Sequence, residues 1–172
     1  GVSLVGSGLW VVSDDVWALS LDGTPEWRPM ATTGTSPGGR QMHAAVYDSR
    51  RQQMIMVSGR EDEGDAQIWS LSLGAEPRWE HLPTLPSVRD GYCTGRMGHA
   101  AIYDSVEDRV LVHGGEGAGS PKPFFELDDT WSLSLADGRR ADVVGLAPSG
   151  DLWIAEGKAS LEGFHTAQKW PA

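Results

Sequence analysis

The chain has 172 residues, of which 40% are apolar, so it is long enough and apolar enough to form a globular domain with a packed core. Its 24 acidic residues outnumber its 14 basic residues and give a formal net charge of −10. The basic residues are spread thinly along the sequence, which predicts that the protein binds neither nucleic acid nor an anionic membrane surface. No apolar run approaches the roughly 20 residues of a membrane-spanning helix.

Two further features limit covalent chemistry and processing. Cys93 is the single cysteine, which excludes an intrachain disulfide framework and a cysteine-based zinc site. The chain starts at Gly1 with no initiator methionine and no signal-type segment, which predicts a processed or truncated start.

A short segment recurs along the chain. Residues 15–21, 67–73 and 129–135 each contain a tryptophan followed by a small residue, leucine, serine and leucine. A second segment, which begins with arginine and ends with Tyr-Asp, occurs at residues 40–48 and 96–104. A period of roughly 50 residues built from short strands is typical of β-propeller blades. The repeat therefore predicts an all-β fold of about three four-stranded blades.

In chain order, the first repeat is predicted at about residues 9–39. Residues 9–12 form an apolar strand, the strand around Trp17 follows, and Trp27 lies in a Pro-x-Trp context that we expect on an outer strand. No segment of this repeat matches the inner strand of the later repeats. We therefore predict that the first blade is partial.

The second and third repeats are predicted at about residues 40–95 and 96–135. In each, an inner strand with two alanines leads through an Asp-Ser turn into a continuous apolar strand and then into the tryptophan strand. In the tryptophan strand, the tryptophan and the leucines share one face and the serines share the other. Residues 1–135 are thus predicted to contain all the repeats.

The pattern changes after Leu135. Residues 143–146 and 152–154 are predicted to form a strand pair around a Pro-Ser-Gly-Asp turn. Residues 163–167 faintly echo the start of an inner strand. Residues 136–172 are therefore predicted to be divergent propeller-like strands or the start of another blade.

These segments resemble the kelch repeat, in which an inner strand ending in Tyr-Asp leads to an apolar strand closed by a double glycine and then to a tryptophan strand. The resemblance covers roughly residues 9–135, with Ser58-Gly59 standing where the later repeat has the double glycine. It implies a partial, bacterial kelch-repeat protein with a galactose oxidase-like β-propeller. It also implies structural roles for the repeated residues Trp17, Trp27, Trp69, Trp79, Trp131, His43, His99, Tyr47, Tyr103, Gly114 and Gly115.

Three blades do not close a propeller, since closed rings usually have four to eight. Either the chain is a piece of a longer propeller, or copies associate to close the ring, or the sheets remain open with protected edges. We favour the piece of a longer propeller, because the array starts and stops out of phase with the repeat.

Long loops on one rim of the blades, including residues 59–67 and 115–128, form the predicted binding face. The aromatic pair Phe124 and Phe125 does not recur in the other repeats and follows Pro-Lys-Pro in the longest loop. This pair is the best single candidate for contact with a ligand.

Three charged residues complete the set of candidate ligand-binding residues. Asp62 and Asp65 lie in an acidic loop whose carboxylates suit a hard cation, but the spacing of a calcium loop is missing, which favours a solvated loop tip. Arg96 leads an inner strand, where contact with a ligand competes with pairing to a neighbouring blade. Pairing is the favoured interpretation.

No metal site, catalytic residue or cofactor is predicted. His99 and His113 were considered as metal ligands, but a lone histidine at a strand end is more often packed or hydrogen-bonded. Copper radical oxidases, some of which are built on kelch propellers, cross-link a tyrosine to a cysteine. The adjacent Tyr92 and Cys93 are poorly placed for this link, and no Tyr-His pair occurs. Serine-hydrolase, phosphate-loop and His-Glu zinc motifs are also absent.

The sequence favours a non-catalytic binding or interaction module that uses the rim loops of a kelch propeller. A protein or carbohydrate ligand is expected, together with possible self-association; nucleic acid and a membrane span are not. The alternatives are a metal-dependent enzyme fragment similar to the copper radical oxidases and an architectural repeat of a larger surface protein. The protein is expected to be soluble, with a secreted, periplasmic or cell-surface location favoured.

Overall fold

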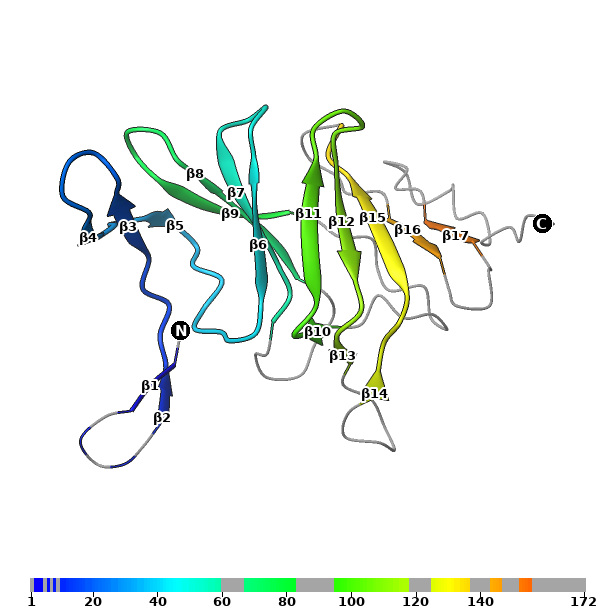
Figure 1. The fold of residues 1–172 in the computed structure, drawn as a ribbon, viewed down its shortest axis with the longest axis horizontal. Coiled ribbons are helices and arrows are strands. Elements are labelled where there is room, and N and C mark those ends of the chain that lie inside the picture. The colour runs from blue at the N-terminus through cyan, green and yellow to red at the C-terminus, as the bar shows by residue number, and fades with distance from the viewer. Residues whose placement is uncertain are drawn as a thin grey trace.

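The structure is a computed structural model that describes residues 2–4, 6, 8, 10–59, 67–82, 95–117, 125–136, 143–146 and 152–155. Every regular element in this part of the chain is a β-strand, which confirms the all-β prediction. Figure 1 shows the sheets following one another in a row from the N-terminal hairpins to β17. The described residues contain no helix long and apolar enough to cross a lipid bilayer.

The first large sheet contains the second repeat. The strands β6 (Ala44–Asp48), β7 (Gln53–Val57), β8 (Ile68–Ser72) and β9 (Arg78–Leu82) form an antiparallel meander, and β5 (Thr33–Gly34) adds to β9 in parallel. The inner strand, the apolar strand and the tryptophan strand lie in the order that the sequence predicts. The outer strand with the Pro-x-Trp tryptophan follows as β9.

The second large sheet has the order β11 (Ala100–Asp104), β12 (Arg109–His113), β15 (Thr130–Ser134), β16 (Val143–Leu146) and β17 (Leu152–Ala155), all antiparallel. The sequence pattern showed no outer strand ten residues after the tryptophan of this repeat. The structure places β16 beside β15, in the position that β9 has beside β8. The predicted strand pair at 143–146 and 152–154 is present as β16 and β17.

Smaller sheets flank these two. At the N-terminus β1 (Val2–Leu4) pairs with β2 (Trp10–Val12), and β3 (Trp17–Ser20) pairs with β4 (Glu26–Pro29). The sheet of β10, β13 and β14 contains Arg96–Met97, Glu116–Gly117 and Phe125–Glu126. Within the N-terminal repeat the structure thus describes the apolar strand β2, the tryptophan strand β3, the outer strand β4 and the short strand β5.

The main apolar core lies between the two large sheets, whose first strands β6 and β11 lie side by side (Figure 1). Burial of apolar side chains from both sheets drives this packing. The buried core residues are Ile55, Val57, Ile68, Leu82, Val110, Val112, Trp131, Leu133 and Leu135.

A second apolar cluster joins the first large sheet to the N-terminal hairpin. Met56, Trp69, Leu71 and Trp79 are buried in it. Val16, Met30 and Met54 pack against them and are partly buried. The tryptophan strand β8 therefore packs on both faces, because its Ile68 belongs to the core between the large sheets.

The turns after β7 and β12 explain why Ser58-Gly59 can replace a double glycine. Ser58 and Gly114 both take a left-handed backbone, with φ of 46° and 67°. At the following position a side chain would not fit, because a Cβ on Gly59 would lie 2.8 Å from the Cβ of His43, and one on Gly115 would lie 2.9 Å from the Cβ of His99. The second glycine is the residue that the turn requires.

The finer prediction of kelch-type propeller blades is not confirmed by the architecture. The sheets are open, and the two large ones have five strands each rather than four. The fifth strands are β5, from the segment before the second repeat, and β17, from the divergent C-terminal segment.

Candidate functional site

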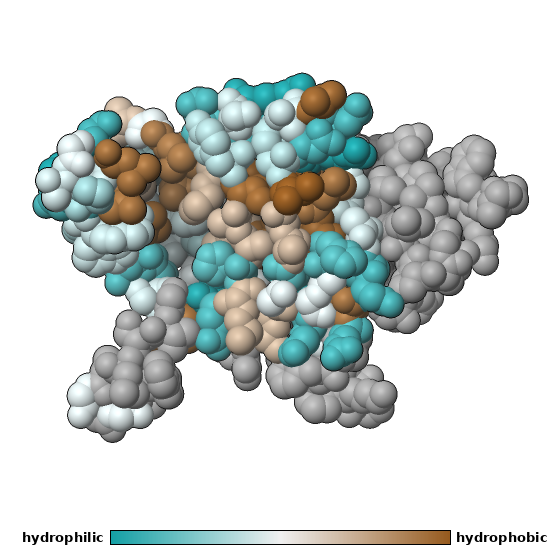
Figure 2. Space-filling model, in the orientation of Figure 1, coloured by the Kyte–Doolittle hydropathy of each residue, from teal (hydrophilic) through white to brown (hydrophobic). Residues whose placement is uncertain are grey.

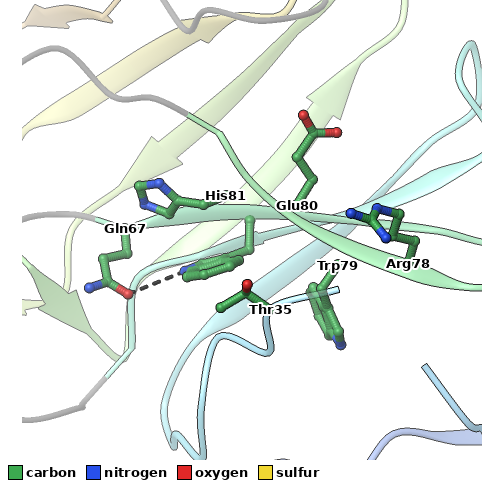
Figure 3. Close-up of a pocket in the computed structure, with 7 residues that line it drawn as sticks. Thr35, Gln67, Arg78, Trp79, Glu80 and His81 are labelled. Atoms are coloured by element: carbon green, nitrogen blue, oxygen red, sulfur yellow. Dashed lines mark hydrogen bonds between the residues drawn. The ribbon is translucent and has the colours of Figure 1, made fainter. Parts of the chain in front are cut away.

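A cleft lies on the first large sheet and in the segment just before it. It encloses about 510 Å³ and is lined by Thr35, Gln67, Trp69, Arg78, Trp79, Glu80 and His81. Figure 3 shows the lining of this cleft, with Gln67 and His81 labelled, and Gln67 Oε1 accepts a hydrogen bond from Trp69 Nε1 at 3.2 Å. The His81 ring meets this indole edge-on, with 4.7 Å between the ring centroids. Sequence reasoning did not single out Gln67 or His81, since neither recurs in the third repeat.

An arginine is buried at the start of each complete repeat. Arg96 is only 3% exposed, and its guanidinium donates to Asp129 Oδ1 at 2.9 Å, Asp129 Oδ2 at 3.2 Å and the Gly114 carbonyl at 3.0 Å. Trp131 Nε1 donates to the same carboxylate. Because both groups of the ion pair are removed from water, the pairing is strongly directional.

The second repeat contains the same arrangement with an amide in place of the carboxylate. Arg40 donates to Gln67 Oε1 at 3.3 Å and to the Ser58 carbonyl at 3.2 Å, and it also contacts the Pro37 carbonyl. Gln67 accepts from Trp69 as Asp129 accepts from Trp131. We call this arrangement of an arginine, an acceptor side chain and a tryptophan the arginine triad.

The N-terminal repeat has the acceptor and the tryptophan of the arginine triad but no arginine in the cleft beside them. Asp15 precedes Trp17 by the same spacing, and this tryptophan is 52% exposed, against 8% for Trp69. A cleft of about 280 Å³ adjoins it. Its lining consists of Asp14, Asp15, Val16, Trp17, Pro29, Met30, Thr32 and Ser36.

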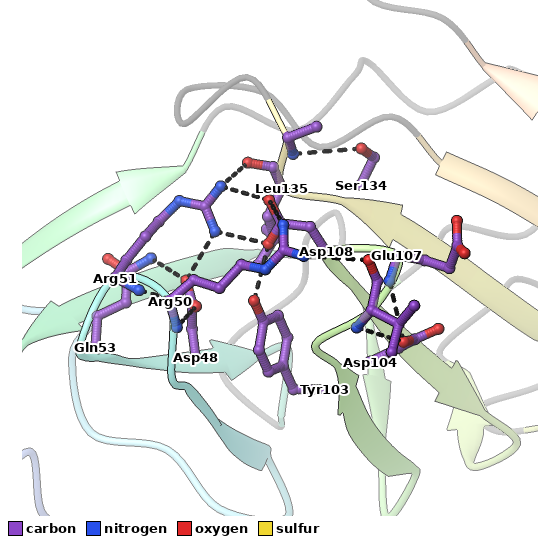
Figure 4. A network of polar contacts seen from close by, with 12 residues as sticks. Asp48, Arg50, Arg51, Gln53, Tyr103, Asp104, Glu107, Asp108, Ser134 and Leu135 are labelled. Carbon is purple, nitrogen blue, oxygen red and sulfur yellow. Dashed lines mark hydrogen bonds and ion pairs between the residues drawn. The ribbon is translucent and has the colours of Figure 1, made fainter.

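A polar network links the two complete repeats at their β-turns (Figure 4). Arg51 reaches from the first large sheet to Asp108 of the second, with N–O distances of 2.8 and 2.7 Å, and also pairs with Asp48. Tyr103 donates to Asp108 at 2.8 Å. The hydrogen bonds from Arg51 lower the pKa of Asp108 to about 2 against the opposing effect of burial. Sequence reasoning missed Arg51, because the third repeat has Glu107 at the equivalent position.

The two histidines considered for metal binding lie in different environments. His99 is buried, and desolvation, assisted by the charge of Arg96, lowers its pKa to about 4, so the ring is neutral at pH 7. His113 is exposed and its Nδ1 lies 2.9 Å from Thr130 Oγ1. Within the residues that the structure describes, no three His, Cys, Asp or Glu side chains gather into a potential metal site.

The other predicted ligand-binding residues cannot be placed in a site. Asp62, Asp65 and Phe124 lie outside the described residues. Phe125 belongs to the short strand β14. Arg96 lies in the arginine triad. Contact of Arg96, Asp62, Asp65, Phe124 and Phe125 with a ligand remains a prediction.

Charged residues adjoin one end of the β16–β17 hairpin in the sequence, and none of them belongs to the repeat. Val143 pairs with Ala155 at one end of the hairpin. In the sequence, the residue before Val143 is Asp142 and the residue after Ala155 is Glu156, and Lys158 follows two positions later. Asp142, Glu156 and Lys158 lie outside the residues that the structure describes.

A family model described as DNA repair protein MmcB-like matches residues 127–172. The matched segment contains β15, β16 and β17, so it continues the second large sheet. This match contradicts the identification as a bacterial kelch-repeat protein with a galactose oxidase-like propeller. It also contradicts the predicted functions, both the rim-loop binding module and its alternatives, the copper oxidase-like enzyme and the architectural repeat.

The predicted partners are corrected by the same match. A protein or carbohydrate ligand without nucleic acid was expected, whereas a DNA-repair family indicates interaction with DNA. The prediction relied on the net charge of −10 and on the thin spread of the basic residues along the sequence. Four of the basic residues lie within the matched segment, namely Arg139, Arg140, Lys158 and Lys169.

Proposed function

We propose that this chain has a DNA-repair-related function in which residues 127–172 act on DNA and the preceding sheets form a scaffold. The family match over this segment supports the proposal. The observation that carries the chemistry is the pairing of Val143 with Ala155, because the next residue outward along the sequence is acidic at both strand ends.

Asp142 and Glu156 have the chemistry of ligands for a hard divalent cation. Carboxylate oxygens bind Mg²⁺ together with water and substrate phosphates rather than in a closed protein cage. A divalent cation held by Asp142 and Glu156 would supply Lewis-acid polarisation of a phosphoryl oxygen of the DNA. Lys158 lies two positions after Glu156 in the sequence. Its ammonium group would contact a phosphate oxygen.

The charge of the chain makes this site dependent on the cation. A net charge of −10 repels a DNA backbone, and the described arginines Arg40 and Arg96 are buried in the arginine triads. The bound cation offsets the local negative charge, and Arg139 and Arg140 add two positive charges just before Asp142. DNA binding is therefore expected to need Mg²⁺ and to weaken as salt is added.

The two large sheets are proposed to act as repeated, propeller-like units that position this segment. β15 pairs with β12 on one edge and with β16 on the other, so backbone hydrogen bonds tie the matched segment to the preceding repeat. Phe124 and Phe125, which precede the matched segment in the sequence, remain proposed ligand contacts, and aromatic side chains can stack on unpaired bases. Contacts of Asp62 and Asp65 with a ligand remain predictions. The secreted, periplasmic or cell-surface location also remains a prediction, and it does not agree with a DNA-directed role.

The test is to measure binding and strand cleavage of fluorescent duplex and single-stranded DNA by the full chain, with Mg²⁺ and with EDTA. We expect binding that requires Mg²⁺, and loss of about tenfold or more in affinity for Glu156→Gln, as for loss of a charged contact. Glu126→Gln, an exposed residue on β14 outside the matched segment, is the matched control. DNA binding that is absent with Mg²⁺, or equal in the two variants, would contradict the proposal.

A further inference from the structure

The first strand of the matched segment, β15, is held at both ends by arginines from outside that segment. Just before β15, Asp129 accepts a hydrogen bond from Arg96 at 2.9 Å. Just after it, the carbonyl of Leu135 accepts one from Arg51 at 2.5 Å. Arg96 belongs to β10, whereas Arg51 lies in the turn between β6 and β7 of the first large sheet. Two earlier parts of the chain therefore fix the strand with which β16 pairs.

Arg51 makes a contact that the repeat does not require. Arg96 has a counterpart in Arg40 of the second repeat, so its triad belongs to the repeated architecture. The residue that corresponds to Arg51 in the third repeat is Glu107. The contact of Arg51 is therefore specific to the place where the two large sheets meet, and it joins the first sheet to the matched segment.

Arg51, Asp108 and Leu135, which we call the clamp, are joined by both side-chain and backbone hydrogen bonds (Figure 4). Two nitrogens of the Arg51 guanidinium donate to the Asp108 carboxylate, at 2.8 and 2.7 Å, and one of them also donates to the Leu135 carbonyl. The backbone N–H of Leu135 donates to the Asp108 carbonyl at 2.9 Å. Leu135 is 5% exposed, so water has little access to replace these bonds, and their loss is costly.

The clamp lies at one end of the two large sheets. The turn after β6 contains Arg51 and the turn after β11 contains Asp108, and Figure 1 shows both turns at the top of the view. The register places Ser134, at the end of β15, opposite Arg109, which directly follows the second turn. In Figure 2 the surface over these turns is mostly hydrophilic. Polar side chains thus gather at the end of the sheets where β15 ends.

Strand pairing connects this end of β15 to the rest of the matched segment. Leu133 pairs with Val143 of β16, and Val143 pairs with Ala155 of β17. Asp142 and Glu156, the proposed cation ligands, adjoin Val143 and Ala155 in the sequence. A displacement of the end of β15 would therefore move the two strand ends that these ligands adjoin.

We propose that Arg51 is a positioning residue for the action of the matched segment on DNA. By holding the Leu135 carbonyl it fixes the end of β15, and the pairing of β15 with β16 passes this constraint to the strand ends at Val143 and Ala155. The inference rests on the function proposed above, and it gives Arg51 no contact with the DNA itself. A planar guanidinium can bond Asp108 and Leu135 at once, whereas a lysine ammonium is a compact point charge without this fork.

The test compares Arg51→Lys with Arg109→Lys by titrating Mg²⁺ in the DNA-binding assay of the full chain. For Arg51→Lys we expect the Mg²⁺ concentration at half-maximal DNA binding to rise about threefold or more, the size typical of substitutions that alter coupling between segments. Arg109→Lys is the matched control, because Arg109 pairs with Asp104 at 3.0 Å within the hairpin of β11 and β12. Its Mg²⁺ midpoint is expected to equal that of the unaltered chain.

Hydrogen exchange measured without DNA gives a second readout. The backbone amides of β16 are expected to exchange faster in Arg51→Lys than in the unaltered chain, because the strand with which they pair is less well held. Arg51→Gln, which also lacks the charge, is expected to show both changes at least as strongly. All measurements are made well below the melting temperature of each variant, so that a difference does not come from global unfolding.

The outcomes separate this inference from the proposed function. If the unaltered chain binds DNA with Mg²⁺ and the Arg51 variants bind with an unchanged Mg²⁺ midpoint, the positioning role is wrong and the proposed function stands. An equal shift of the midpoint in Arg109→Lys, or unchanged exchange of the β16 amides in both Arg51 variants, would also overturn the positioning role alone. Absence of DNA binding by the unaltered chain would overturn both.

Discussion

The N-terminal repeat and the second repeat have nearly the same tryptophan strand but different surroundings. In the second repeat, Trp69 lies on β8, which pairs with β7 on one edge and with the outer strand β9 on the other. Its side chain is hydrogen-bonded to Gln67 and is buried. In the N-terminal repeat Trp17 has the outer strand alone and is half exposed. The motif therefore forms a strand by itself, but it becomes core only when an apolar strand and an arginine join it.

The largest expected difference between the two repeats lies in their tryptophans. Trp69→Ala empties a large buried site and should lower the free energy of unfolding by about 3–5 kcal/mol. Trp17→Ala removes a half-exposed side chain and should cost about 1 kcal/mol or less. Urea denaturation of the two variants measures both values. Equal losses would mean that the exposed hairpin is as well packed as the complete repeat.

The next largest difference in unfolding free energy is expected between substitutions of Asp129, the acceptor in an arginine triad, and of Asp15, its equivalent in the N-terminal repeat. Asp129→Ala leaves the buried Arg96 without its carboxylate, and removal of one partner of a buried ion pair costs about 3 kcal/mol or more. Asp15→Ala, at the equivalent position in the N-terminal repeat, should change the free energy of unfolding by about 0.5 kcal/mol or less. Urea denaturation of the two variants measures both changes in unfolding free energy. A marginal loss for Asp129→Ala would mean that Arg96 finds another acceptor.

The smallest effect concerns the two repeat-equivalent histidines. The pKa of His99 is about 4 when folded and 6.5 in the reference state, so the unfolded chain binds more protons between these values. Stability is therefore expected to fall as the pH drops from 6.5 toward 4. Exposed His43 has its pKa lowered less, mainly by desolvation.

Chemical denaturation across this pH range tests the histidine comparison. His99→Gln should flatten the dependence of stability on pH more than His43→Gln does. NMR titration of the ring protons gives the two pKa values directly. A His99 that titrates near 6.5 would show that water reaches the ring.

Local patterns allowed much of the fold to be predicted. The inner, apolar and tryptophan strands of both complete repeats were placed correctly, as was the strand pair that became β16 and β17. Alternation, apolar runs and Asp-Ser turns are short-range signals, which explains this success. The family identification was wrong, because a repeat pattern fixes strands rather than function, and the match to a DNA-repair family lies in the segment where the repeat ends.

The candidate sites were harder to predict than the strands. Arg96 was recognised as a residue that leads an inner strand, but its acceptor Asp129 is distant in the sequence and was assigned only to a turn or edge role. Asp142 and Glu156, the proposed cation ligands, lie outside the repeat and were not singled out from the sequence. The pairing of Val143 with Ala155 is what relates them.

The sequence by itself determined the all-β class, the recurrence of the tryptophan strand and the position of most strands, because these depend on residues near one another in the chain. Only the tertiary structure decided that Trp69 is buried while Trp17 is exposed, and that Arg96 meets Asp129. Both outcomes depend on strands brought together from distant parts of the chain. Within the part of the chain that the structure describes, the buried tryptophan and the buried ion pair occur where such strands pair with one another.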